Sequence, residues 1–205
     1  GKTINYTVKE VGTPSGYEIT NVKDSSGTVT LTNKHTPETT QVSGEKIWND
    51  NNNQDGVRPT SVIVNLLANG KEVNQQTVSA STNWKYSFTN LPKYENGKEI
   101  EYTVTEDSNT DYTTVVDNEK ETITNNYTPG KTSVTVTKGW DDKNDQDAIR
   151  PKSIQVQLYA NNVKKGDVVA LNEGNDWTHT WGDLDEKADG KAIVYTVKEV
   201  GTVNG

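Results

Sequence analysis

The sequence contains no cysteine among its 205 residues and is poor in apolar side chains. Without cysteine, a disulfide framework and a thiolate metal site are both excluded, so any covalent staple must have another chemistry. Apolar residues make up 30% of the chain, against roughly 45–50% in a usual globular protein. These residues fall in short alternating runs, which favour thin two-sheet domains over one thick core.

Positive charge and long apolar runs are also scarce. The balance of 21 basic against 29 acidic residues gives a formal net charge of -8, which repels phosphate backbones and anionic membrane surfaces. We therefore expect no nucleic-acid partner and no membrane partner. The sequence shows no stretch of 18 apolar residues, no signal peptide and no wall-sorting tail. If the parent protein is secreted, this chain is expected to be an internal piece of it.

The chain repeats itself with an offset of 92 residues. Residues 45–59 (EKIWNDNNNQDGVRP) align with 137–151 (TKGWDDKNDQDAIRP), and residues 31–37 (LTNKHTP) align with 123–129 (ITNNYTP). A third motif occurs three times, as INYTVKE at 4–10, IEYTVTE at 100–106 and IVYTVKE at 193–199. We therefore predict the back part of one repeat at 1–37, a complete repeat at 38–129, and the front part of another at 130–205. Both junctions are short and contain proline, which limits swinging.

Within a repeat, the apolar residues alternate as they do in β-strands. This pattern runs through residues 61–67, 84–88 and 101–105. The pairs Asn69-Gly70 and Asn96-Gly97 predict hairpin turns, and no segment shows a helical period. About seven short strands per repeat predict an all-β fold of tandem immunoglobulin-like β-sandwiches.

These motifs resemble the B repeats of the collagen adhesin, the Cna B-type domains of Gram-positive surface proteins, and the resemblance covers nearly the whole chain. It implies a stalk or spacer that holds a separate ligand-binding region away from the cell wall. It further implies an extracellular, cell-wall-anchored parent, no cofactor and no enzymatic turnover. The expected partners are neighbouring repeats of the same chain, and a host matrix protein would be bound only through other regions of the parent.

The resemblance also implies an autocatalytic isopeptide bond between a lysine amine and an asparagine carboxamide, assisted by a buried acid. The complete repeat carries Lys46, Glu106 and Asn125 in that order. Lysine is a nucleophile only when neutral, and burial beside Trp48 and Tyr102 would lower its pKa. The same apolar setting favours an uncharged carboxyl on Glu106, which can donate to the carboxamide and pass a proton to the departing ammonia. The alternative is that the lysine and the acid are ordinary surface charges and the asparagine a turn residue.

In the two partial repeats this trio is split. Lys138 and Glu199 lie in the C-terminal part, whereas Glu10 and Asn33 lie in the N-terminal part. Neither end can close its own bond, but together the ends hold every strand of one repeat. Strand complementation between molecules is therefore an alternative assembly, head to tail, with a bond from Lys138 to Asn33. Against it, residues 1–12 duplicate residues 190–201, so one copy would have to be displaced.

The polar loops at 49–56 and 141–147 look at first like calcium loops. Asn51, Asn53 and Asp55 fit the front of an EF-hand pattern, but its twelfth position is Val62 instead of Glu. The second copy departs further, with a lysine and an alanine at ligand and turn positions. We therefore expect a solvated loop that caps the sandwich, and no metal site.

Three further signals bear on function. The five tryptophans recur largely at matching repeat positions, so core packing is expected in preference to a sugar-stacking platform. His35 and His179 are too few and too far apart for a metal site. A binding function, in which loops at the sandwich ends engage a host protein or glycan, stays open. The similarity of loops 51–58 and 144–150 favours a shared structural role instead.

Overall fold

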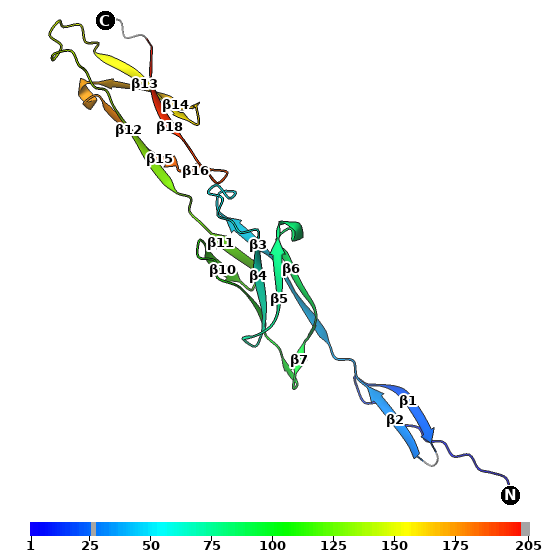
Figure 1. Cartoon of the computed structure of the whole chain (residues 1–205). Helices are drawn as coiled ribbons and strands as arrows, with labels where there is room; N and C mark the ends of the chain where they lie inside the picture. Colours follow the sequence, from blue (N-terminus) through cyan, green and yellow to red (C-terminus); the bar gives the residue numbers. More distant parts are fainter. Residues whose placement is uncertain (26–27, 202–205) are drawn as a thin grey trace.

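The chain forms a rod of three parts, with the two termini at opposite ends (Figure 1). The computed structural model describes residues 1–25 and 28–201. We name the parts by their strands: the N-terminal hairpin (β1 and β2), the central sandwich (β3 to β11) and the C-terminal sandwich (β12 to β18). Within the described residues, no helix is long and apolar enough to span a membrane.

The central sandwich has two facing sheets. One has the order β10-β11-β3-β6 and the other β5-β4-β9. These two sheets agree with the prediction of about seven strands in a repeat. The first sheet holds β3 (Thr39–Asn49), β6 (Lys85–Pro92), β10 (Thr113–Asp117) and β11 (Thr122–Asn126). The second holds β4 (Ser61–Ala68), β5 (Lys71–Ser79) and β9 (Tyr102–Glu106). A small hairpin, β7 (Tyr94–Glu95) with β8 (Lys98–Glu99), and the 3-10 turn η1 (Ala80–Thr82) complete it.

Alternating side chains from both sheets form the core of the central sandwich. Its buried members are Val62, Val64, Leu66, Val78, Tyr86, Phe88, Leu91, Val104 and Ile123. Trp48 and Trp84 pack against this cluster. The strand expected over 84–88 begins instead at Lys85, because Trp84 has a φ of 58° and turns the chain into the strand. Both predicted hairpin turns are confirmed: Asn69, Gly70, Asn96 and Gly97 all have positive φ, as type I′ turns demand.

The first and last strands of the central sandwich are neighbours and run parallel. Lys46 of β3 lies opposite Ile123 of β11, and Trp48 lies opposite Asn125. Gly44 of β3 permits this approach, since a Cβ there would collide with the Glu121 carbonyl oxygen and the Tyr86 hydroxyl. The chain therefore enters at one end of the sandwich and leaves at the other.

The C-terminal sandwich repeats this plan with fewer strands. Its sheets are β12-β15 and β14-β13-β18, with a small β16-β17 hairpin. The bounds are β12 (Lys131–Thr137), β13 (Ser153–Ala160), β14 (Val163–Asn172), η2 (Glu173–Asn175), β15 (Thr178–Asp185), β16 (Lys187–Ala188), β17 (Lys191–Ala192) and β18 (Tyr195–Val200). Its buried cluster contains Ile154, Val156 and Leu171, against which Trp140, Trp177 and Trp181 pack. All five tryptophans therefore pack against cores, as predicted.

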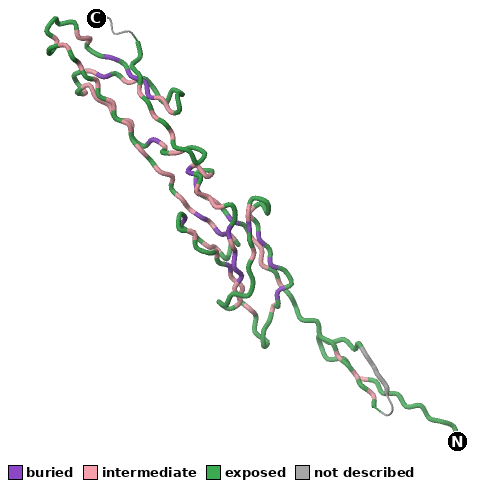
Figure 2. Tube along the Cα trace, viewed as in Figure 1, coloured by how far each residue is buried: buried purple, intermediate pink, exposed green. Residues whose placement is uncertain are grey.

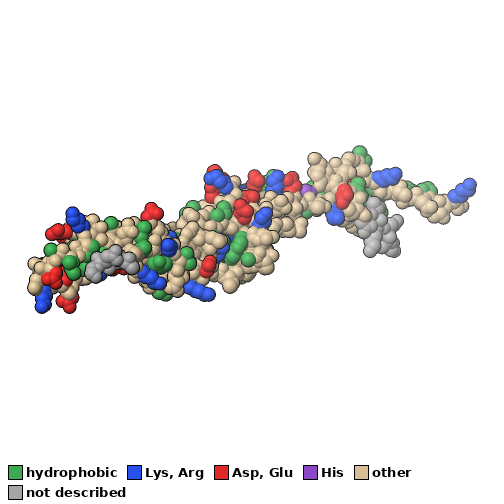
Figure 3. Space-filling view, turned by 90° about the horizontal axis from the view of Figure 1, so that it is seen from above, with side chains coloured by type: hydrophobic (Ala, Val, Ile, Leu, Met, Phe, Trp, Pro, Cys, Tyr) green, Lys and Arg blue, Asp and Glu red, His purple; other side chains and the backbone are tan. Residues whose placement is uncertain are grey.

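The N-terminal hairpin pairs β1 (Glu18–Ser25) with β2 (Thr28–Lys34) in antiparallel register. None of residues 1–20 and 28–38 is buried, and Figure 2 shows the buried positions confined to the two sandwiches. On the face of the rod seen in Figure 3, acidic and basic side chains are interspersed along its length.

Candidate cross-link site

Three side chains from three strands of the central sandwich meet in its interior. Lys46 projects from β3, Asn125 from the adjacent β11, and Glu106 from the end of β9 in the facing sheet. The Lys46 Nζ lies 3.1 Å from Glu106 Oε2. The Asn125 amide donates to Glu106 Oε1 at 2.6 Å. The carboxylate thus contacts both groups that a lysine-to-asparagine bond would join.

The site is dry. The side chains of Lys46 and Glu106 are both fully buried, and Asn125 has no exposed surface. Burial lowers the pKa of Lys46 to about 8, although Glu106 acts in the opposite direction through its charge and hydrogen bond. A neutral amine is therefore far more accessible here than on an exposed lysine. The alternative of ordinary surface charges with a turn asparagine is wrong for this trio.

The carboxamide of Asn125 is only half satisfied. Its nitrogen donates to Glu106, whereas its Oδ1 is buried without a hydrogen-bond partner. With a protonated Glu106, turning the amide over would place the carboxyl O–H on Oδ1. That contact would draw electrons from the carboxamide carbon and make it a better electrophile.

Aromatic rings cover the lysine. The Lys46 ammonium lies 4.7 Å from the ring centre of Trp48. Tyr112 packs edge-on against Trp48, with the two ring centres 5.0 Å apart. Tyr102, the second aromatic expected beside the lysine, instead donates its hydroxyl to the Pro92 carbonyl.

The C-terminal sandwich holds half of an equivalent site. Lys138 Nζ lies 3.1 Å from Glu199 Oε2, the same separation as in the central sandwich. Trp140 flanks this lysine at 4.6 Å, as Trp48 flanks the other. The two side chains are 26% and 31% exposed, however. The pair is formed, but water reaches it, and among the described residues no asparagine side chain bonds to it.

The N-terminal part holds the complementary half. The Asn33 amide donates to Glu10 Oε1 at 3.0 Å, and Asn33 Oδ1 is buried without a partner, as in Asn125. The two halves lie at opposite ends of the rod (Figure 1). One molecule therefore cannot bring Lys138 to Asn33.

A polar network beside the site was not predicted from the sequence. Arg58 donates two hydrogen bonds to Asp50, at 2.8 and 2.6 Å, and the Tyr112 hydroxyl donates a third at 2.9 Å. These bonds, the one from Arg58 foremost, lower the pKa of Asp50 to about 2. The signal was present in the aligned copies, because Asp142 and Arg150 keep the same spacing and make the same paired bonds.

The loop between β3 and β4 is not the solvated cap that we expected. Asp50 is 1% exposed and Asp55 is 6% exposed. The carboxylates bind Arg58, Tyr112, Tyr127 and the Gly130 amide. Among the described residues, no three His, Cys, Asp or Glu side chains are placed to hold a metal ion.

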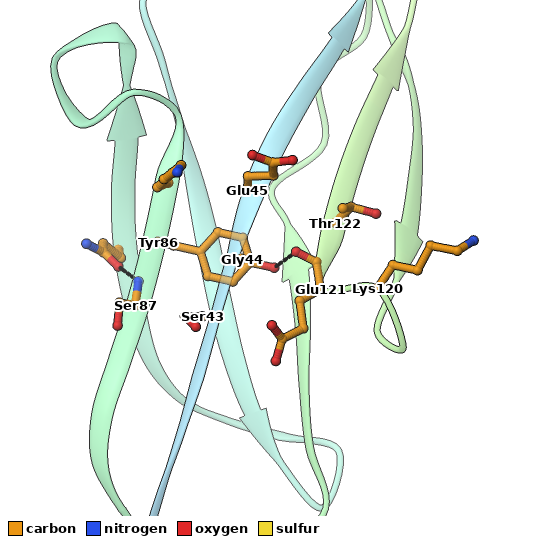
Figure 4. Close-up of a pocket in the computed structure, with 10 residues that line it drawn as sticks. Ser43, Gly44, Glu45, Tyr86, Ser87, Lys120, Glu121 and Thr122 are labelled. Carbon is orange, nitrogen blue, oxygen red and sulfur yellow. Dashed lines mark hydrogen bonds between the residues drawn. The ribbon is translucent and has the colours of Figure 1, made fainter.

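One hollow of the central sandwich lies on its surface, beside β3, β6 and the start of β11. It has a volume of about 500 Å³, and its lining includes Gly44, Glu45, Tyr86, Lys120, Glu121 and Thr122. Figure 4 shows the Tyr86 hydroxyl reaching the Glu121 carbonyl across its floor. Polar and charged side chains from β3, β6 and the β10–β11 turn surround it.

This architecture agrees with comparisons to known proteins. The family model described as the Cna protein B-type domain matches residues 42–126 and 134–204. The chain belongs to this family. It is 54% identical over all of its 205 residues to a collagen adhesin of Staphylococcus aureus, and it spans 17% of that protein's length.

Two solved structures of B repeats are also similar. The crystal structure of two B repeat units of the collagen-binding protein of Staphylococcus aureus is 55% identical, with a TM-score of 0.53. The match covers 93% of this chain and 51% of that one. A single B repeat unit of the same protein is 57% identical, with a TM-score of 0.43, over 82% of this chain and 89% of that one. The chain is thus made of tandem Cna B-type repeats with an immunoglobulin-like, all-β fold.

Proposed function

We propose that this chain is a stretch of structural stalk from a bacterial surface adhesin, in which the complete repeat is locked by an isopeptide bond. Its modules are the back part of one repeat (1–37), a complete repeat (38–129) and the front part of another (130–205). The parent is extracellular and held at a Gram-positive cell wall, and any collagen or other matrix protein is bound by regions outside these repeats. The chain turns over no substrate.

The bond forms in one turnover within the protein. Glu106 takes the proton from Lys46, leaving a neutral amine and a carboxylic acid. The amine nitrogen attacks Cγ of Asn125 while the carboxyl hydrogen-bonds to its Oδ1. Glu106 gives its proton to the leaving Nδ2 and takes one proton from the attacking nitrogen. The bond from Cγ to Nδ2 breaks, and ammonia departs. The products are an amide between Lys46 and Asn125 and a free ammonia molecule.

The observation that carries this proposal is the shared, fully buried carboxylate of Glu106. A buried lysine and carboxylate offer little net stability compared with apolar residues of the same size. Their placement against a half-satisfied carboxamide has a clear chemical use, because desolvation promotes proton transfer from the amine to the acid. The bond would also stabilise a module that has a small core and, without cysteine, no disulfide.

Intact mass of the denatured chain tests the bond. We expect a mass about 17 Da below that of the sequence, since one ammonia is lost. Lys46→Ala, Glu106→Gln and Asn125→Ala should each restore the full mass for their sequence. The matched variants Lys138→Ala and Glu199→Gln should keep the deficit in the monomer. A wild-type mass equal to that of the plain sequence would overturn the proposal.

A second proposal is that the open ends of two molecules pair with one another. The N-terminal hairpin matches the β10-β11 hairpin of the complete repeat: Ile19 pairs with Asn33 as Thr114 pairs with Asn125. The ring centres of Tyr17 and His35 are 5.4 Å apart, and those of their counterparts Tyr112 and Tyr127 are 5.5 Å apart. Tyr17 is 48% exposed, however, whereas Tyr112 is 8% exposed.

The C-terminal sandwich presents the matching gap. Its strand β12 pairs only with β15, whereas β3 pairs with both β6 and β11. A hollow of about 300 Å³ is lined by Asp142, Asp147 and their loop neighbours. The equivalent aspartates of the central sandwich bind the hydroxyls of Tyr112 and Tyr127. The hairpin of a second molecule would fill this gap and bring Asn33 toward Lys138. Because Glu10 and Glu199 occupy equivalent positions, one of them would have to be displaced.

Concentration-dependent assembly tests this pairing. We expect head-to-tail multimers by sedimentation and, after bond formation, a covalent ladder on a denaturing gel. Lys138→Ala and Asn33→Ala should abolish the ladder, whereas Asn125→Ala should keep it. Monomers alone at high concentration would refute this second proposal and leave the first untouched. Where another repeat adjoins in the same chain, its strands would compete for the gap.

Recognition of a host protein or glycan through end loops has less support. The loop after β3 is partly occupied by the neighbouring module, because Gly130 and Gly190 both donate backbone hydrogen bonds to it. On the face seen in Figure 3, acidic and basic side chains are interspersed, a pattern that does not favour binding of nucleic acid or an anionic membrane there.

A further inference from the structure

The loop of residues 50–56 joins the central sandwich to the C-terminal one at two separate points. The carboxylate of Asp55 accepts a hydrogen bond from the Gly130 amide at 2.8 Å, in the linker that leads to β12. The Gln54 carbonyl accepts from the Gly190 amide at 3.0 Å, in the turn between β16 and β17. These two donors lie far apart in the sequence. The loop therefore contacts the following module at its first residues and at the turn that contains Gly190.

A short linker and a second contact together limit bending far more than a linker alone. The covalent path from Tyr127 to Lys131 contains Pro129, whose φ is fixed. The Tyr127 hydroxyl also binds Asp55, at 2.9 Å, so the linker is held on both sides of the proline. The contact at Gly190 then opposes rotation about the linker, which would otherwise be the default freedom of adjoining domains.

The junction before the central sandwich has no such second contact. Among the hydrogen bonds of the described residues, none joins residues 1–25 or 28–37 to the central sandwich. The front part of that first repeat, which would carry the equivalent loop, is not in this chain. In this chain the second junction therefore has the contact that opposes rotation, and the first shows only its linker.

The loop is preformed and does not need its neighbour to fold. In the C-terminal sandwich, loop 142–148 repeats the internal bonds: the Asp145 amide binds Asp142, and the Arg150 amide binds Asp145. The distances are 3.0 and 2.8 Å, against 2.9 Å for both equivalents in the first loop. The second copy is uncovered, however, and Asp147 is exposed where Asp55 is buried.

The two loops differ at one position that faces the neighbouring module, which is Gly56 in the first loop and Ala148 in the second. A Cβ on Gly56 would lie 2.6 Å from the Cα of Gly190, closer than such contacts occur. The second loop has Ala148 at this position, in the same left-handed conformation with a φ of 53°. Its methyl group stands where the turn of a following module would have to lie.

We propose that loop 50–56 is a docking socket for the next Cna B-type module, with Asp55 as its positioning residue and Gly56 as the opening that admits the module's turn glycine. The socket makes the central and C-terminal sandwiches one rigid body. Loop 142–148 has the same shape, but the methyl group of Ala148 blocks this mode of docking. A module that follows loop 142–148 would therefore be joined less rigidly than the C-terminal sandwich is to the central one.

Distances between two spin labels in the full chain test the joint. Because the chain has no cysteine, Lys71→Cys on β5 and Lys164→Cys on β14 can be labelled alone. Labelled chains are diluted with unlabelled ones, so that only intramolecular distances count. We expect a single narrow distribution, at least twofold broader in Asp55→Ala and shifted or broadened in Gly56→Ala. Labels at Lys34→Cys and Lys71→Cys should give a broad distribution across the first junction.

Matched variants in the unoccupied loop serve as controls. Asp147→Ala and Ala148→Gly should leave the distribution from Lys71 to Lys164 unchanged. Near-ultraviolet circular dichroism should remain that of the parent in every variant, which separates a loosened joint from an unfolded module. A broad wild-type distribution, or equal widths for the parent, Asp55→Ala and Gly56→Ala, would overturn the proposal. Neither result depends on whether the isopeptide bond forms.

Discussion

The central and C-terminal sandwiches contain the same lysine and acid pair at the same 3.1 Å separation, yet in different surroundings. Lys46 and Glu106 are fully buried, whereas Lys138 and Glu199 are 26% and 31% exposed. The first strand, the tryptophan beside the lysine and the loop with its arginine are present in both. The difference is the hairpin β10-β11, which the central sandwich has and the described residues of the C-terminal sandwich, up to residue 201, do not include.

This comparison shows where the reactive environment comes from. The ion pair forms without the last two strands. Without them, however, its side chains stay partly exposed to water. Strand β11 supplies the electrophile, and Tyr112, just before β10, covers the tryptophan that flanks the lysine. The hairpin that carries Asn125 therefore also shields Lys46 and Glu106 from water. Bond formation is expected only once the module is completely folded.

The largest expected difference between the two sandwiches follows from the cross-link itself. Asn125→Ala should destabilise the central sandwich by about 4 to 5 kcal/mol, by analogy with a disulfide that closes a loop of about 80 residues. Its melting temperature should fall by roughly 20 °C or more. Differential scanning calorimetry of the full chain measures this, with Asn33→Ala as the matched control. A central transition unmoved by Asn125→Ala would mean that no cross-link contributes.

Stability against pH exposes the buried lysine once the bond is absent. Burial lowers the folded pKa of an uncrosslinked Lys46 to about 8, below its ordinary value of 10.5, and Asn125→Ala keeps the lysine uncrosslinked. The unfolded chain then binds more protons between pH 8 and 10.5, so the free energy of unfolding rises with pH across this window. The rise should reach up to about 3 kcal/mol.

Urea titrations at several pH values would measure this rise. Adding Lys46→Met should flatten the pH dependence, because the titrating amine is gone. A rise of the same size in the double variant would assign the effect to other groups.

The arginine networks should differ less, but in the same direction. Arg58→Ala removes two bonds from Asp50, which is 1% exposed, and should destabilise the central sandwich by about 2 kcal/mol. Arg150→Ala should have a smaller effect, since water can reach Asp142. The pKa of Asp50 is lowered to about 2. The contribution of its ionised form is therefore complete above pH 4 and lost as the pH falls toward 2. Chemical denaturation at pH 7 and pH 2 checks both points, and equal losses in the two sandwiches would contradict the comparison.

The smallest expected effect concerns the loop position that differs between the copies. Ala148 has a φ of 53°, a left-handed conformation that disfavours a side chain with a Cβ. Ala148→Gly should stabilise the C-terminal sandwich by about 0.5 kcal/mol, because the relief of strain is partly offset by the greater freedom of glycine in the unfolded chain. The melting transition of that sandwich measures it. Gly56→Ala should shift the central transition in the opposite direction.

Much of the fold was predictable because its signals are local. Alternating apolar residues defined β4 and β9. The Asn-Gly pairs specified the turns that join β4 to β5 and β7 to β8, through left-handed backbone conformations. The resemblance to the Cna B-type repeats pointed to the candidate trio, and each of its members recurs in a partial copy. The convergence of Lys46, Glu106 and Asn125 agrees with that expectation, and the bond between them stays a prediction.

The remaining features depend on contacts between distant segments. Asp55 lies in a polar run that looks solvated, and only Tyr127 and Gly130 of the linker bury it. The turn at Gly190 is more distant still, and no periodicity links it to Gly56. Trp84 fits an alternating strand pattern, yet its backbone turns left-handed. Such features require the packing of whole modules, which a pattern within one segment does not encode.

The parallel pairing of β3 with β11 has a mechanical consequence. Tension applied along the rod enters at Thr39 and leaves at Asn126, so the two strands are loaded in shear. A covalent bridge from Lys46 to Asn125 would carry that load from one strand directly to the other. The intervening 47–124, about 270 Å of chain when extended, would then feel no force. Each locked repeat would behave as an inextensible link, and only its junctions could yield to pulling.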